Sequence, residues 1–180
     1  NSSPYVFNNV TSNHTVTAKF SNIFSIVVLP SPDGIISPSG TVSVTYGDSL
    51  VFNITPNTGY QIDSIFVNGV YVGNTSPFTV YNITTNVTIR VKFRLKTYTV
   101  TVIQPSNGSI SPTGPLTVSH GDNKTFTVSP STGYHIDSIF INGSYVGNIS
   151  PYTLSNITGN STVSAKLSIN TYSITVTQPQ

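Results

Sequence analysis

The chain has 180 residues, of which only 7% are charged, against about 25% in a typical soluble protein. Seven Lys and Arg oppose five Asp, with no Glu, and the net charge is +2. The cations form no basic run, so we expect no nucleic-acid partner, because binding to phosphates needs clustered Lys and Arg. The absence of cysteine excludes disulfides and thiol-based sites. No apolar stretch reaches the ~18 residues of a membrane helix.

An internal repeat of 74 residues organises the chain. The segment that begins at Phe24 aligns without a gap with the segment that begins at Tyr98, and the same pattern starts again at Tyr172. About 35 of the 74 aligned pairs are identical, which identifies a repeat architecture. The predicted domains are the tail of a preceding repeat at 1–22, full repeats at 23–96 and 97–170, and the first strand of a following repeat at 171–180.

Each repeat is predicted to consist of β-strands throughout. Apolar and polar residues alternate along YTVTVI, along 50–54 and along 89–93, as in half-buried strands. Asn68-Gly69 and Asn142-Gly143 separate two such runs, and Asn-Gly supplies the two positive φ angles of a tight hairpin. We therefore expect about six or seven short strands per repeat, packed as tandem small β-sandwich domains of immunoglobulin-like class.

The joints between repeats, KFSNIF and KFRLKTY, are too short to act as flexible linkers. A unit of about 74 residues has a thin core, and without disulfides it would be marginally stable alone. We therefore expect neighbouring units to touch and to support one another, as in other repeat arrays.

Four motifs recur in the same order in both full repeats: G-x-I-S-P-x-G, P-x-x-G-Y-x-I-D-S-I, N-G-x-Y-V-G and N-I-T-x-N. This order resembles the divergent bacterial repeat related to the internalin B-repeat, and the resemblance extends to the two partial repeats. It implies a secreted or cell-surface protein of a bacterium or archaeon, in which such repeats serve as stalks, adhesion modules or filament building blocks. It also implies an alternative fold, a compact β-grasp-like unit.

Thirteen Asn-x-Ser/Thr triplets occur, none with proline in the middle. Chance accounts for some of them because Asn, Ser and Thr are abundant, but several recur in register between repeats, which favours acceptor sites for N-glycans on an extracellular protein. Sugars would also supply the hydrophilic surface that charged residues usually provide. The predicted glycosylation sites are Asn1, Asn9, Asn13, Asn53, Asn74, Asn82, Asn86, Asn107, Asn123, Asn142, Asn148, Asn156 and Asn160.

The acidic and imidazole side chains are too few and too scattered to predict an enzyme. Asp48 and Asp122 follow glycine at equivalent positions, where Asp usually bonds to the local backbone of a turn. His120 and His135 have no histidine counterpart in the first repeat, and the spacing of a calcium loop is absent. We expect no catalytic residue, no metal site and no cofactor other than covalent N-glycans.

Six aromatic residues recur in register, and we expect them to pack in the core and turns, with a sugar-binding face as the alternative. They are Tyr60, Phe66 and Tyr71 in the first repeat and Tyr134, Phe140 and Tyr145 in the second.

The expected function is that of a structural subunit in a glycosylated extracellular filament, pilus-like fibre or cell-surface stalk, on an archaeal rather than a bacterial surface. Residues 1–20 offer two strands and residues 171–178 offer one. A strand of one subunit can complete the sheet of the next and build a head-to-tail polymer. The partners would be further copies of the chain and other cell-surface components. The alternatives are an adhesin, a carbohydrate-binding module, or the non-catalytic repeat tail of a secreted enzyme.

Overall fold

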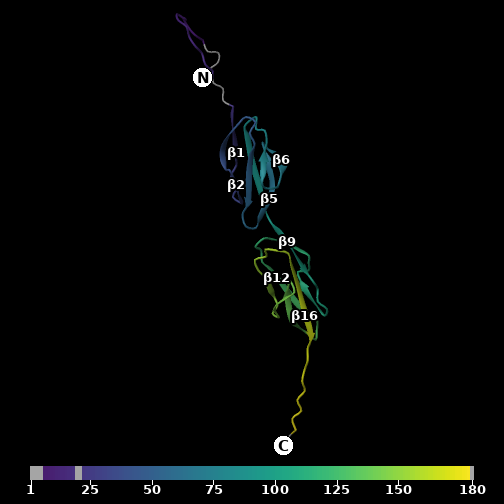
Figure 1. Cartoon of the computed structure of the whole chain (residues 1–180). Helices are drawn as coiled ribbons and strands as arrows, with labels where there is room; N and C mark the ends of the chain where they lie inside the picture. Colours follow the sequence, from purple (N-terminus) through teal and green to yellow (C-terminus); the bar gives the residue numbers. More distant parts are fainter. Residues whose placement is uncertain (1–5, 19–21, 179–180) are drawn as a thin grey trace.

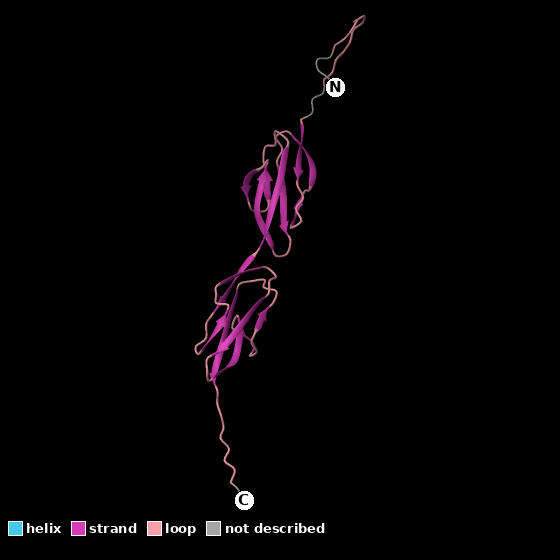
Figure 2. Ribbon diagram, turned by 180° about the vertical axis from the view of Figure 1, so that it is seen from behind, coloured by secondary structure: helices cyan, strands magenta, loops and turns pink. Residues whose placement is uncertain are grey.

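The computed structural model describes residues 6–18 and 22–178. Two units of eight strands each lie end to end, and the two termini lie at opposite ends of the molecule (Figure 1). Every regular element in the described residues is a strand (Figure 2), which confirms the all-β class. No helix that could span a membrane occurs in this part of the chain.

The first unit contains a five-stranded sheet, in the order β3-β1-β8-β5-β6, and a three-stranded sheet, in the order β2-β4-β7. Its strands are β1 (Ile23–Val28), β2 (Gly34–Ser37), β3 (Gly40–Thr45), β4 (Leu50–Pro56), β5 (Tyr60–Val67), β6 (Val70–Gly73), β7 (Phe78–Val80) and β8 (Val87–Leu95).

The second unit repeats this topology strand for strand, in the orders β11-β9-β16-β13-β14 and β10-β12-β15. Its strands are β9 (Thr97–Val102), β10 (Gly108–Ser111), β11 (Leu116–Ser119), β12 (Lys124–Pro130), β13 (Tyr134–Ile141), β14 (Ser144–Gly147), β15 (Tyr152–Leu154) and β16 (Ser161–Ile169).

The predicted tandem β-sandwiches are thus confirmed, and the β-grasp-like alternative is not the arrangement that the structure has. Each unit has eight strands rather than the six or seven expected. The difference arises from strands of only three or four residues, such as β2, β6 and β7, which are too short to show an alternating pattern.

The core of each unit lies between its two sheets. In β4, Phe52 and Ile54 are buried while Asn53 between them is exposed, so the alternation read from the sequence matches the pleat. Ile26 and Ile65 close the core from the five-stranded sheet and are fully buried. A side chain of this size stabilises the fold by about 1.5–3 kcal/mol when it is fully buried.

The first and last strands of each unit pair side by side in parallel. In the first unit β1 and β8 pair with Ile26 opposite Val87, and in the second β9 and β16 pair in the same register. An asparagine side chain continues each pair, because Asn86 Oδ1 accepts a hydrogen bond of 3.0 Å from the backbone N–H of Ser25. The unit is therefore closed by contact between the two ends of its own chain segment.

The predicted Asn-Gly hairpins connect β5 to β6 and β13 to β14. Asn68 and Gly69 have φ angles of 50° and 82°, and Asn142 and Gly143 have 52° and 79°. Asn68 Oδ1 also accepts a hydrogen bond of 2.7 Å from the N–H of Thr88 in β8, so each hairpin is tied to the centre of its sheet.

Candidate functional site

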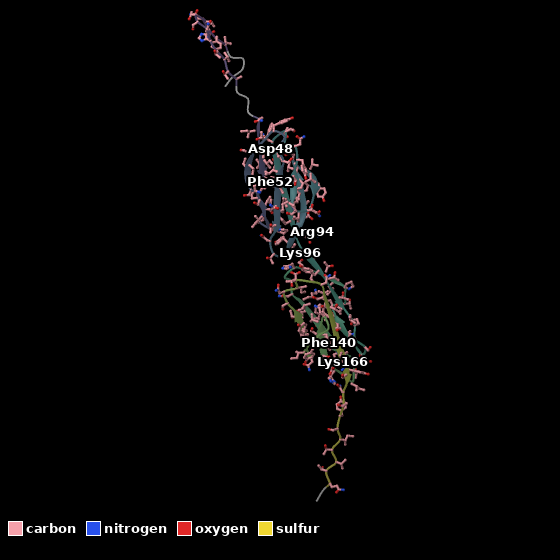
Figure 3. All side chains as sticks on the ribbon, viewed as in Figure 1. Asp48, Phe52, Arg94, Lys96, Phe140 and Lys166 are labelled. Atoms are coloured by element: carbon pink, nitrogen blue, oxygen red, sulfur yellow. The ribbon has the colours of Figure 1, made fainter. Side chains whose placement is uncertain are left out.

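The joint between the two units is built around the backbone of Lys96. Its N–H donates to the carbonyl of Gly59 in the first unit at 2.8 Å, and its carbonyl accepts from the N–H of His120 in the second unit at 2.9 Å. Figure 3 shows Lys96 where the two units meet. A single residue thus bonds to both units, as expected of a joint too short to act as a linker.

The imidazole of His120 lies directly over the glycine turn of the first unit. A Cβ atom added to Gly59 would come 2.5 Å from Cδ2 of His120, so only glycine leaves room for the ring. His120 Nδ1 lies 3.1 Å from the hydroxyl of Tyr98, with the ring centroids 5.9 Å apart. The ring is therefore held by its own unit and packs against the neighbouring one.

The two Asp residues that follow glycine bond to the local backbone, as predicted. Asp48 Oδ2 accepts from the N–H of Thr45 at 3.0 Å, and Asp122 Oδ2 accepts from the N–H of Ser119 at 2.9 Å. The described residues contain no group of three or more His and Asp that could hold a metal ion. These two carboxylates therefore stabilise the turns in which they lie.

The remaining carboxylates of β5 and β13 form exposed ion pairs. Asp63 lies 3.5 Å from Arg94 Nε, and Asp137 lies 3.2 Å from Lys166 Nζ. The hydrogen bond from Lys166 lowers the pKa of Asp137 below its usual value. Exposed pairs of this kind contribute little to stability, so they serve local positioning.

His135 has a local partner as well, since its Nδ1 lies 3.0 Å from Asn170 Oδ1. Asn170 stands at the end of the second unit, at the position that corresponds to Lys96. His120 and His135 therefore lie at unit ends, and neither belongs to a cluster of ligands among the described residues.

The recurring aromatic pairs, which were predicted to pack in the core and turns, lie across the Asn-Gly hairpins and partly on the surface. Tyr71 is 58% exposed and Tyr145 is 62% exposed. Tyr71 meets the ring of Phe66 edge-on at 6.1 Å. The cause is a β-bulge at Asp63, after which Ile65 points into the core and Phe66 to the outer face.

The second unit repeats this aromatic pair. Phe140 and Tyr145 meet edge-on with centroids 6.3 Å apart. In the first unit a cation, Lys92 Nζ, also lies 5.3 Å from the ring centroid of Phe66. Tyr60 and Tyr134 are half-buried, which agrees with the predicted packing at the start of their strands.

Residues 171–178 leave the second unit as an extended segment without strand pairing (Figure 1). Tyr172, Ile174 and Val176 are 86%, 93% and 84% exposed. Their counterparts in β9 include Val100, which is fully buried. The alternating apolar side chains that are buried in the first strand of a complete unit are therefore exposed in this segment.

The described residues near the N-terminus show the same contrast. Val10 and Val16 are 60% and 65% exposed, whereas their counterparts Ile83 and Ile89 are 2% and 0% exposed. Of the two strands expected in 1–20, part lies outside the described residues, and residues 6–18 are not paired as strands.

Two divergent InlB B-repeat domains match the chain, at residues 24–97 and 98–171. The chain belongs to the divergent InlB B-repeat family. Tandem B-repeats are typical of bacterial cell-surface and secreted proteins, and the match contains only these non-catalytic repeat domains. No curated protein and no solved structure matches the chain.

The Asn-x-Ser/Thr sites of both B-repeats lie on the surface. Asn1 is outside the described residues, and each of the twelve others is exposed. They are Asn9, Asn13, Asn53, Asn74, Asn82, Asn86, Asn107, Asn123, Asn142, Asn148, Asn156 and Asn160.

Several of these asparagines also have a role in the fold of the B-repeat. Asn82 and Asn156 have φ angles of 48° and 51°, a left-handed conformation that asparagine tolerates better than most residues. Asn160 Oδ1 accepts from the N–H of Thr99 at 2.9 Å. A glycan is attached through Nδ2 and leaves Oδ1 in place, so the structural bond and the modification are compatible.

Because of the contact at the joint, we expect substitution by alanine to lower the free energy of unfolding by different amounts at two equivalent glycines. Gly59 and Gly133 have φ angles of +83° and +85°, but only Gly59 is covered by a ring. Gly59→Ala should therefore lower the free energy of unfolding by about 1–3 kcal/mol more than Gly133→Ala, because overpacking adds to the shared backbone strain. Urea unfolding of both variants measures the difference, and equal losses would contradict the contact.

Proposed function

We propose that the chain is a structural element of a glycosylated extracellular filament, pilus-like fibre or cell-surface stalk, with B-repeats arranged in series and subunits joined head to tail by strand complementation. The observation that carries this proposal is the unpaired extended segment at 171–178, whose alternating apolar side chains are 84–93% exposed. Exposed strand edges readily accept a strand from another chain.

The pairing within each unit supplies the register for such a contact. Residues 171–178 correspond to β9, and residues 13–18 correspond to the start of β8. If two copies adopted the register of β9 with β16, Ile174 would lie opposite His14 and Val176 opposite Val16 of the other copy. Asn13 Oδ1 would accept from the N–H of Ser173, as Asn160 does from Thr99. A second copy of the chain is therefore the proposed partner.

Glycosylation is supported by the exposure of all twelve described Asn-x-Ser/Thr sites. The surface carries few charges, since charged residues make up 7% of the chain, and a protein needs other hydrophilic groups to stay soluble. Glycans also shield strand edges from unwanted pairing. The combination of B-repeats, many candidate glycan sites and few charges supports an extracellular place on an archaeal surface.

The exposed aromatic pairs support a second candidate, a carbohydrate-binding adhesin module. Tyr71 and Tyr145 each project a ring beside a phenylalanine, and sugars stack on such faces. Loss of glycan-array binding in a Tyr71→Ala, Tyr145→Ala variant would favour this function, whereas an array without binding would favour the structural one.

Strand complementation predicts that a specific disulfide can form between two copies. Because the chain contains no cysteine, only the introduced cysteines can form it. Oxidation of a Thr15→Cys, Thr175→Cys variant should give a ladder of covalent oligomers on a non-reducing gel, because the two positions face each other in the proposed register. A Val27→Cys, Thr88→Cys variant serves as the positive control for oxidation, since these residues are opposite each other in β1 and β8. Its disulfide forms within one chain and is measured as loss of free thiol.

A variant with Thr15→Cys and Thr171→Cys is displaced by four residues and serves as the negative control. It should form few oligomers under the same conditions. An equal yield of oligomers from both pairs, or none from Thr15→Cys with Thr175→Cys, would contradict the proposed register.

If Asn160 is glycosylated, one substitution should remove its glycan and another should remove its structural hydrogen bond. In the native host, Thr162→Val should abolish the glycan at Asn160, as measured by glycopeptide mass spectrometry. In unglycosylated protein it should leave the free energy of unfolding nearly unchanged, whereas Asn160→Ala should lower it by about 1 kcal/mol through loss of the bond to Thr99. Unmodified Asn160 in the native protein would contradict the prediction at this site.

A further inference from the structure

The end of the second unit repeats one half of the joint between the units. The N–H of Asn170 donates to the carbonyl of Gly133 at 2.8 Å, as the N–H of Lys96 does to Gly59. Gly133 also has the same left-handed φ as Gly59. The difference is that no atom lies within 4 Å of a Cβ built on Gly133, which is exposed, whereas Gly59 is buried under His120.

The beginning of the first unit repeats the other half of the joint. The N–H of Tyr46 donates to the carbonyl of Asn22 at 2.8 Å, as the N–H of His120 does to Lys96. The Tyr46 ring lies 6.2 Å from Phe24, much as His120 lies 5.9 Å from Tyr98. Tyr46 is 60% exposed, so its ring covers no glycine turn in this chain.

We propose that the Gly133 turn is a docking surface for a further unit of the same repeat, whose Tyr or His ring covers Gly133 as His120 covers Gly59. In a chain that continues with such a unit, residues 171–178 would form its first strand instead of pairing with another copy. The ring would then follow Asn170 by 24 residues, as His120 follows Lys96. Tyr46 would make the same contact with the unit before it.

The joint between the first and second units indicates which partner fits the Gly133 turn. Each element of the joint recurs at a spacing of 74 residues: the two backbone hydrogen bonds, the glycine and the ring. The Gly133 turn leaves a shallow surface free, and the partner must supply a planar ring that packs on it. Both Tyr and His satisfy this requirement, because they occupy the same position in the two units. The inference rests on the proposed function only in that units follow one another in series.

The test is a chain of three units, made by adding a second copy of residues 107–170 after residue 180. Residues 171–180 correspond to 97–106, so the added segment completes a third unit and brings a copy of His120 to the joint. Residual dipolar couplings measured by NMR report the orientation of each unit. We expect the second and third units to share one fixed orientation, equal to that between the first and second.

Two variants of the three-unit chain remove the contact from either side. Gly133→Ala should free the third unit, which would then align independently of the second. Alanine in place of the third unit's copy of His120 should do the same without straining the Gly133 turn. In the chain of 180 residues, Gly133→Ala should leave the alignment of the two units unchanged.

Gly143→Ala is the matched control, because Gly143 has a φ of +79° and nothing within 4 Å of its Cβ position but lies in a hairpin. It should leave all three units aligned. A third unit that aligns independently without any substitution, or that stays aligned in both joint variants, would overturn the inference. The third unit is covalently attached, so failure of strand complementation between copies would not alter this outcome.

Discussion

The parallel pairing of the first and last strands is the constraint on which the rest of the structure depends. Because β1 and β8 run in the same direction, the chain enters a unit at one end and leaves it at the other. An antiparallel pair would return the chain to the end at which it entered. Because of this parallel pairing, successive units follow one another in one direction, and the two units lie end to end (Figure 1).

The joint converts this topology into a fixed arrangement. Lys96 bonds through its backbone to both units, and His120 packs on Gly59. The contact involves a glycine surface and a ring rather than ion pairs, which suits a chain with so few charges. A short joint with contacts on both sides resists bending, and this resistance is what a stalk or filament requires.

The local parts of this architecture could be predicted from the sequence. Alternation along 50–54 indicated that Phe52 faces the core, and Asn68-Gly69 identified a hairpin. Both are local signals, because a pleat and a tight turn depend on residues close in the chain. Asp48 was also predicted correctly, since an Asp after Gly acts within its own turn.

The long-range parts could not be predicted in this way. The pairing of β1 with β8 joins residues about 60 apart, and no local pattern indicates that it is parallel. The ring of His120 over Gly59 was missed for the same reason, although glycine and an aromatic or imidazole residue at corresponding places in both repeats were a usable signal. The outward facing of Phe66 and Tyr71 could not be predicted because the β-bulge at Asp63, which reverses the facing of later residues, has no distinct sequence signal.

We propose that the B-repeats of this chain form a linear extracellular structure. Cryo-electron microscopy of undigested surface material from the natural source tests it most directly, with the chain identified in the same material by mass spectrometry. We expect thin, straight filaments or stalks with an axial period of one or two units and with sugar density at the exposed asparagines. Compact particles, or strings of units without a constant angle between neighbours, would contradict it.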